Sequence, residues 1–230
     1  MGVKQSKIMK NLKLTLSLFL ICLVFATCKK DKGMPTVTDV DGNVYHTVKI
    51  GTQTWMVENL KTTKFNDGSP ITPITDNTAW VNTLGPAYCY YNIDATKKTP
   101  YGALYNWQAV NTGKLAPKGW HVPSKVEFET LFNTIGGDVS TAHKLKELGN
   151  SHWPIFNVSA TDDYGFALMP SGFRSPIGNF QNINQTSYVW SSTSISAGSS
   201  TALHVDHNGD DLELPGYSQI NCFSVRCIKD

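Results

Sequence analysis

The densest group of potential metal ligands in the sequence is the segment HVDHNGDD, residues 204–211. Two histidines with a carboxylate can hold a transition metal, whereas a run of side-chain oxygens suits calcium. Residues 204, 206 and 208 alternate along a predicted strand and would project from one face. A polar hairpin turn around Asn208-Gly209 explains the same composition without a metal, and we favour that interpretation. We therefore expect no cofactor, and calcium is the alternative, held by the oxygen ligands of this set. The candidate metal ligands are His204, Asp206, His207, Asn208, Asp210 and Asp211.

Three cysteines follow the first 28 residues, Cys89, Cys222 and Cys227. In an exported protein such thiols tend to pair, and an odd number leaves one over. Cys222 and Cys227 are close in sequence and would need a turn between them to reach the Cα separation of about 5.5 Å that a disulfide requires. Cys89 with Cys227 is the preferred pair, and the pairing stays open.

Two short motifs each contain a residue that could take part in chemistry, GWHVP at 119–123 and SGFR at 171–174. We expect Trp120 to pack in the core and His121 to bond the backbone where a helix begins. Arg174 can form paired hydrogen bonds with a carboxylate of the domain. All three residues are therefore interpreted as structural.

Aromatic residues make up 11% of the chain, and several lie in loop-rich regions. Exposed rings stack on sugars or anchor protein partners, although we expect half or more of these to be core. The candidate ligand-binding residues are Trp80, Tyr88, Tyr90, Tyr91 and Tyr188. No catalytic residue is predicted, because the sequence has no nucleophile elbow, phosphate loop or HExxH motif.

The first 27 residues resemble a signal peptide, with four lysines followed by the apolar run LTLSLFLICLVFA. This run is too short for a membrane-spanning helix, which needs about 20 apolar residues. Phe25-Ala26-Thr27 before Cys28 is similar to a lipobox, so Cys28 is the expected lipidation site and membrane anchor. We expect a tether over 28–35, a single domain over 36–230, and a lipid-anchored location in the cell envelope, on the outer membrane, with the face left open.

Removal of residues 1–27 changes the formal charge from the +2 of the whole chain to −2, because four lysines and no acidic residue are lost. A mildly acidic domain without a basic stripe argues against nucleic acid as a partner. With 18 glycines and 11 prolines, the composition favours many turns and short strands over a helical bundle.

The predicted elements are strands, then helices, then strands, which indicates an α+β domain. Ser124 and Glu127 form a capping box, and Gly136-Gly137 ends the helix that they begin. Leu104 and Trp107 lie at helical spacing in a second predicted helix. The predicted strands are 36–39, 43–50, 53–60, 87–92, 166–169, 188–192, 202–205 and 223–228, and the predicted helices are 100–112, 124–135 and 141–148.

Seven segments in order resemble the Fibrobacter succinogenes major paralogous domain family of exported bacterial proteins. They are DVDGNVYHTVKIGTQTWMVENL (39–60), YCYYNID (88–94), YGALYNW (101–107), PKGWHVPS (117–124), GFALMPSGFR (165–174), VWSST (189–193) and FSVRCIKD (223–230). The family is similar, more remotely, to the C-type-lectin-like fold of formylglycine-generating enzymes. This resemblance implies a mixed fold with short twisted antiparallel strands, two main helices, long loops and neighbouring chain ends. Ala116 stands where the family often has a cysteine, so a disulfide from that position is excluded.

The resemblance and the lack of a catalytic set predict a non-enzymatic, lipid-anchored binding or adhesion-type module of the cell envelope. Its partner would be a glycan or an envelope protein. One alternative is a structural envelope subunit with a protein partner. Another is an oxidising enzyme of the formylglycine-generating type, with Cys222 and Cys227 as its reactive pair.

Overall fold

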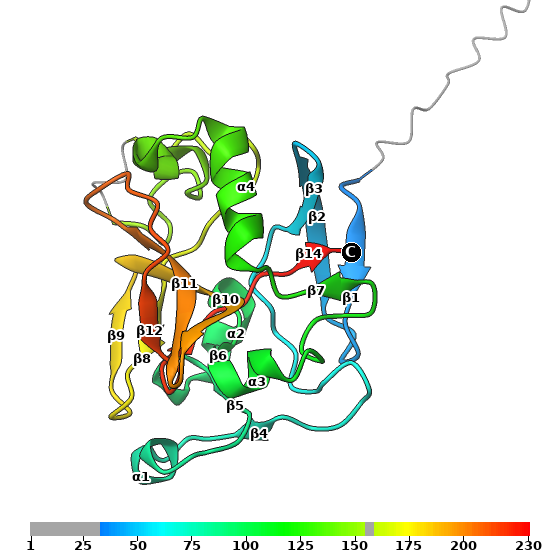
Figure 1. The fold of residues 1–230 in the computed structure, drawn as a ribbon, viewed down its shortest axis with the longest axis vertical. Coiled ribbons are helices and arrows are strands. Elements are labelled where there is room, and N and C mark those ends of the chain that lie inside the picture. The colour runs from blue at the N-terminus through cyan, green and yellow to red at the C-terminus, as the bar shows by residue number, and fades with distance from the viewer. Residues whose placement is uncertain (1–32, 155–158) are drawn as a thin grey trace, which may run out of the picture. The chain divides into compact units, whose positions relative to one another are not determined.

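Three β-sheets carry the fold in the computed structural model, which describes residues 33–154 and 159–230 (Figure 1). All described strand pairs are antiparallel except β4 with β5. The first sheet has the order β1 (Thr36–Thr38), β2 (Val44–Ile50), β3 (Gln53–Met56), β14 (Ile228–Lys229), β7 (Trp120–His121). The second has the order β4 (Thr72–Pro73), β5 (Ala87–Cys89), β6 (Leu104–Asn106), β13 (Cys222–Phe223), β8 (Ser171–Arg174), β9 (Phe180–Ile183). The third joins β10 (Thr186–Ser196), β11 (Ser199–Asp206) and β12 (Gly216–Ser218).

The helices are short, and together with the sheets they confirm an α+β fold. The α-helices are α1 (Asn77–Val81), α2 (Lys98–Tyr101), α3 (Trp107–Asn111) and α4 (Lys125–Ile135), and the 3-10 turns are η1 (Tyr91–Ile93), η2 (Ala95–Lys97) and η3 (Val139–Lys144). Among the described α-helices only α4 is longer than five residues. The expectation of two main helices is therefore wrong for this chain.

The predicted helix over 100–112 is interrupted by a strand. Gly102 ends α2 with a φ of +79°, and a side chain there would meet the backbone of residues 59 and 60. The chain then forms β6, where Tyr105 pairs with Tyr88 on one side and Phe223 on the other. Strands on both sides bury every residue of β6. A strand that is buried on both faces has a continuous run of apolar residues, and such a run cannot be distinguished from a buried helix by its spacing.

The capping box that predicts α4 is present in the structure. The Glu127 N–H donates to Ser124 Oγ, and the Ser124 N–H donates to Glu127 Oε2 at 2.7 Å. Gly136 ends the helix with a φ of +138°. Phe128, Leu131 and Ile135 face the core, whereas Val126, predicted on the same face, is exposed.

Other predicted elements differ in their details. The strand at 188–192 lies within β10 and that at 202–205 within β11, but 166–169 forms only an isolated bridge at Leu168. The segment 223–228 divides into β13 and β14, which belong to different sheets. The helix at 141–148 is the shorter turn η3.

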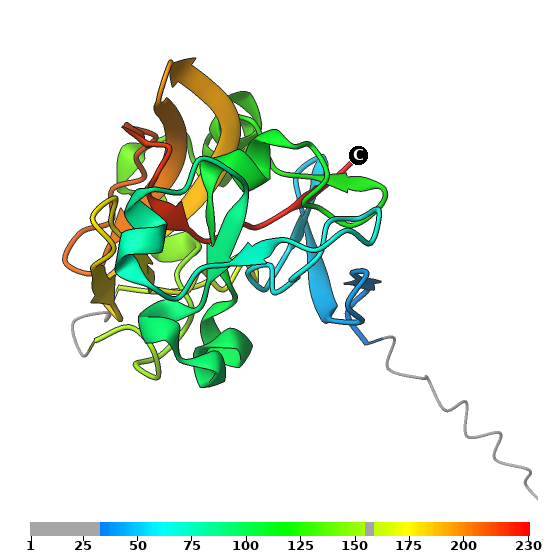
Figure 2. The ribbon, with the colours of Figure 1, turned by 90° about the horizontal axis from the view of Figure 1, so that it is seen from below.

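The core consists of three clusters of buried side chains. The first surrounds Trp190 and Phe223, and the second joins Trp55 and Phe128 beneath α4. The third, around Trp80, lies at the end of the domain where α1 and β4 are found (Figure 1). Both β1 and β14 belong to the first sheet, so the domain begins and ends in one sheet (Figures 1 and 2).

Two expectations concern residues at the start of the chain. The signal segment 1–27 and Cys28 lie outside the described residues. Gly33–Asp230 form one contact unit that contains the whole expected domain. Within the described residues no helix is long and apolar enough to cross a bilayer.

Candidate functional site

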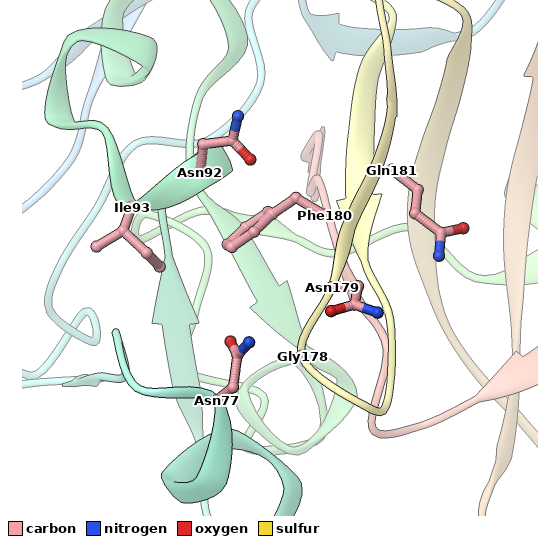
Figure 3. Close-up of a pocket in the computed structure, with 7 residues that line it drawn as sticks. All are labelled: Asn77, Asn92, Ile93, Gly178, Asn179, Phe180 and Gln181. Carbon is pink, nitrogen blue, oxygen red and sulfur yellow. The ribbon is translucent and has the colours of Figure 1, made fainter.

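An open pocket of about 610 Å³ lies between the start of α1, the turn η1 and the β8–β9 hairpin (Figure 3). Its lining residues are Asn77, Asn92, Ile93, Gly178, Asn179, Phe180 and Gln181. The Phe180 ring extends toward η1, and the Asn77 amide points into the same space, whereas the Gln181 amide points away from it. The described lining residues are uncharged.

The lining combines amides with an aromatic ring. A carboxamide offers two N–H donors and an oxygen acceptor, so Asn77, Asn92 and Asn179 can each donate and accept. Phe180 is half-buried and keeps part of its ring accessible. This combination suits an uncharged ligand that has hydroxyl groups on its edges and an apolar face.

Arg174 holds the two walls of the pocket together. Its side chain is fully buried, and Nη2 donates to Asn77 Oδ1 at 2.8 Å while Nε donates to the Gly178 carbonyl at 3.1 Å. Nη1 donates to the Ile74 carbonyl at 2.6 Å. The structural role of Arg174 is as expected, but its acceptors are carbonyl and amide oxygens instead of a carboxylate.

Two aromatic rings flank the Arg174 guanidinium. Its central carbon lies 4.7 Å from the Trp80 ring centroid and 5.1 Å from that of Phe180. Such cation–π contacts gain strength when the cation is desolvated. The rings and the guanidinium therefore form one stack that sets the position of Phe180 in the pocket.

The backbone around the pocket contains residues in the left-handed region. Asn92 and Ile93 have φ values of +53° and +58°, and Asn182 and Asn184 have +59° and +62°. Asparagine often adopts this conformation, whereas a β-branched isoleucine in it is an outlier. Strained residues persist where the surrounding structure holds them, often at ligand sites. Ile93 is held there with its side chain at the pocket.

Three of the five candidate aromatic residues are buried and cannot stack on a ligand. Trp80, Tyr91 and Tyr188 expose 0%, 6% and 8% of their surface. Tyr88 and Tyr90 are half-buried and contact each other edge to face, with centroids 5.7 Å apart. Trp80 and Tyr91 support the pocket from behind, because each contacts Arg174 or Phe180.

The candidate metal ligands are divided among separate partners. His204 Nδ1 lies 3.1 Å from Glu213 Oε2, and the ring stacks on Tyr188. His207 Nδ1 lies 2.7 Å from Asp206 Oδ1. Asn208 lies in the turn after β11, and Asp211 lies in the loop that follows this turn. In residues 33–154 and 159–230, no three His, Cys, Asp or Glu side chains are grouped to hold a metal.

A lysine ammonium lies at this turn. Lys146 is buried, and its Nζ donates to the Gly209 carbonyl at 2.6 Å and lies 3.4 Å from Asp210 Oδ1. Burial lowers the pKa of Lys146, which the charge of Asp210 partly offsets. The loop that contains Gly209 and Asp210 is thus already in contact with a cation of the chain itself, the Lys146 ammonium.

The three described cysteines are buried, and the preferred pair is wrong. Cys89 Sγ lies 3.7 Å from Cys222 Sγ, and both belong to the third cluster. Cys227 belongs to the first cluster instead. The expectation failed because β6 brings β5 and β13 to its two edges, a long-range pairing that residue spacing does not reveal.

His121 and Trp120 connect β7 to α4 and to the last residue. His121 Nε2 lies 2.7 Å from Glu127 Oε1, and Nδ1 lies 2.6 Å from Asp230 Oδ1. His121 therefore binds two carboxylates and not the backbone that we expected. Trp120 is half-buried and packs against the first cluster. Partial burial lowers the pKa of His121, but the two carboxylates outweigh it and the net pKa is raised.

The contacts of His121 with Glu127 and Asp230 predict that the difference in unfolding free energy between wild type and His121→Gln depends on pH. The raised pKa of His121 contributes stability that is fully present below about pH 6.5 and is lost as pH rises through the raised value. Burial raises the pKa of Glu127, but its hydrogen bonds to Ser124 and His121 lower it overall, so that its contribution is present above about pH 4.5 and lost in acid. The difference in unfolding free energy should be largest between these limits.

Urea unfolding from pH 4 to pH 9 measures this difference. His46→Gln is the matched control, because His46 Nδ1 contacts a single carboxylate, that of Glu58. A His121→Gln deficit that stays constant across this range, or that follows the His46→Gln deficit, would contradict the assignment.

None of the residues that line the pocket was among the candidate residues identified from the sequence. Asn77, Asn92, Asn179 and Gln181 are ordinary loop residues by type, and Phe180 was not among the aromatic candidates. The available signal was the SPIGN turn after Arg174, in which a glycine lies between a buried arginine and a phenylalanine. Gly178 is needed there, because an added Cβ would lie 2.8 Å from the Asn77 amide.

Comparison with known proteins gives one match. Residues 48–229 match the family model described as the Fibrobacter succinogenes major domain. Neither a curated protein nor a solved structure gives a significant match. The matched range includes the pocket, Arg174 and all three described cysteines.

Proposed function

This chain belongs to the Fibrobacter succinogenes major domain family, and we propose that it is a non-enzymatic module that binds a neutral glycan in the pocket at Phe180. The pocket's composition is the observation that supports this proposal. Amides exchange hydrogen bonds with hydroxyl groups, and an aromatic face covers the C–H face of a sugar ring. The uncharged lining favours a neutral sugar over an acidic one.

The proposal includes the location and the finer fold. Cys28 would carry the lipid that holds the domain at the cell envelope, on the outer membrane, and labelling with a lipid precursor tests that anchor. We also propose that the domain is a variant of the C-type-lectin-like fold. The sharing of one sheet by β1 and β14, with long loops elsewhere, supports this variant.

Removal of the Phe180 ring should weaken glycan binding about tenfold, on the order of 1.4 kcal/mol. The full chain is first screened on an array of neutral and acidic oligosaccharides, and the best ligand is then titrated calorimetrically into wild type and Phe180→Ala. Phe132→Ala is the matched control, because Phe132 is also half-buried but lies on α4.

Three outcomes would contradict the proposal. They are an array without any binding, a preference for acidic sugars, and equal affinities of wild type and Phe180→Ala. A selective loss of affinity in Phe180→Ala would support the pocket as the binding site.

A protein ligand is the second candidate, and two exposed aliphatic residues in the segments that follow α1 and β8 favour it. Leu84 exposes 92% of its surface and Ile177 exposes 66%. Ile177 precedes Gly178 of the pocket, and Leu84 follows α1. Exposed aliphatic side chains mark protein contacts when they lie together. Cross-linking in membranes that captures one defined envelope protein, lost in Leu84→Ser, would favour this candidate.

A further inference from the structure

Two of the three described cysteines lie in contact although they are far apart in the sequence. The Sγ atoms of Cys89 and Cys222 are 3.7 Å apart, and both side chains are buried. Cys89 ends β5 and Cys222 begins β13, and each of these strands pairs with β6. The sheet pairing therefore directs both thiols into the third cluster.

The surroundings of the pair favour reaction at Cys89. Burial alone would raise the pKa of the Cys89 thiol, but the Cys222 thiol and the Arg174 guanidinium lower it overall. Burial and the neighbouring Cys89 raise the pKa of Cys222. The thiolate is the nucleophile in disulfide exchange. In the native arrangement the thiolate therefore forms more readily on Cys89 than on Cys222.

We propose that Cys89 and Cys222 form an intramolecular disulfide as the chain folds, and that Cys227 stays a free buried thiol. The Cys89 thiolate attacks an external disulfide, such as glutathione disulfide, and releases one glutathione thiolate. The Cys222 thiolate then attacks the Cys89 sulfur of the mixed disulfide and releases the second. The protons of the two cysteine thiols pass to the two glutathione thiolates, so the external disulfide is the oxidant.

The disulfide would reinforce the sheet behind the pocket. It would join β5 to β13 across β6, next to the Trp80 and Arg174 side chains. A cross-link between distant residues restricts the unfolded chain, and the restriction grows with the length of the loop that it closes. The oxidised protein should therefore melt at a higher temperature than the reduced protein.

Peptide mapping tests the proposed pairing. The full chain is refolded from the reduced, denatured state in a glutathione redox buffer, alkylated, and digested with trypsin under denaturing conditions. Cleavage after Arg226 separates Cys222 from Cys227. The expected product is a cross-link between the peptides of Cys89 and Cys222, with Cys227 alkylated. A cross-link that contains Cys227, or alkylation of all three, would overturn the proposal.

The thermal effect provides a second readout. Reduction should lower the melting temperature of wild type and of Cys227→Ser, but leave that of the Cys89→Ser, Cys222→Ser double variant unchanged. Equal melting temperatures of oxidised and reduced wild type would count against a disulfide that stabilises the sheet. No ligand enters either readout, so these outcomes are independent of glycan binding.

Discussion

Replacement of Arg174 by methionine should lower the free energy of unfolding by about 3–5 kcal/mol and weaken ligand binding at the pocket. The guanidinium is fully buried and donates to the Ile74 and Gly178 carbonyls and to the Asn77 amide. Methionine fills part of the volume but donates no hydrogen bond. Each buried acceptor that loses its partner costs roughly 1–3 kcal/mol.

The effect of Arg174→Met on binding has a separate cause. Arg174 joins Asn77 of α1 directly to Gly178 of the β8–β9 hairpin, so its loss removes the direct restraint on their spacing and leaves the Trp80 Nε1 bond to the Ser175 carbonyl. Phe180 also loses the cation beneath its ring. The pocket should therefore bind weakly even under conditions where the variant is folded.

Urea unfolding followed by tryptophan fluorescence measures the loss of stability. Lys118→Met is the control, because it removes an exposed cation and introduces the same side chain. Arg174→Lys separates charge from geometry, since an ammonium keeps the charge but lacks the planar fork that reaches acceptors on both walls of the pocket. A loss below about 1 kcal/mol in Arg174→Met would show that the buried arginine is not needed to hold the walls together.

Gly172→Ala should be the most damaging small substitution, with a loss of more than about 3 kcal/mol. Gly172 lies in β8 with a φ of +60°, opposite β9. An added Cβ would collide with the Gln181 carbonyl oxygen and would lie 2.6 Å from the Ile183 nitrogen. Both are backbone atoms in paired strands, so neither can move without disrupting the hairpin that carries Phe180.

Gly113→Ala is the matched control for Gly172→Ala. Gly113 has a similar φ of +67°, but no atom lies within 4 Å of an added Cβ. That variant should lose only the cost of the left-handed conformation, about 1–2 kcal/mol. Thermal and urea unfolding of both variants measure the difference. If the two lose equal stability, backbone conformation alone explains the effect and the close approach of β8 and β9 is not decisive.

Local signals predicted the elements that depend on neighbouring residues. Ser124 and Glu127 are three residues apart, and their reciprocal bonds form within one turn, so α4 was predictable almost to the residue. The alternation of burial in β2 likewise follows from its own sequence. The helix expected over 100–112 failed because Tyr105 is buried by β5 and β13, which come from distant parts of the chain.

The site depends on the same kind of long-range contact and was therefore not predictable. Arg174 was interpreted as structural from its local motif, but its acceptors Ile74 and Asn77 are about 100 residues earlier in the chain. Asn77 and Phe180 have no local feature that distinguishes them from other loop residues. The Lys146 contact with the loop at Gly209 and Asp210 was not predictable for a related reason, since Lys146 approaches that loop from a separate segment.

The position of β14 constrains the order in which the domain can be made. Ile228 pairs with Trp55 on one side and with His121 on the other, so the last strand of the domain lies between β3 and β7 in the first sheet. Until a nascent chain extends to residue 228, β3 and β7 each keep an unpaired edge, and such edges recruit other chains. Contacts between the two ends of a chain also form slowly. The first sheet can therefore be completed only once residue 228 has been synthesised.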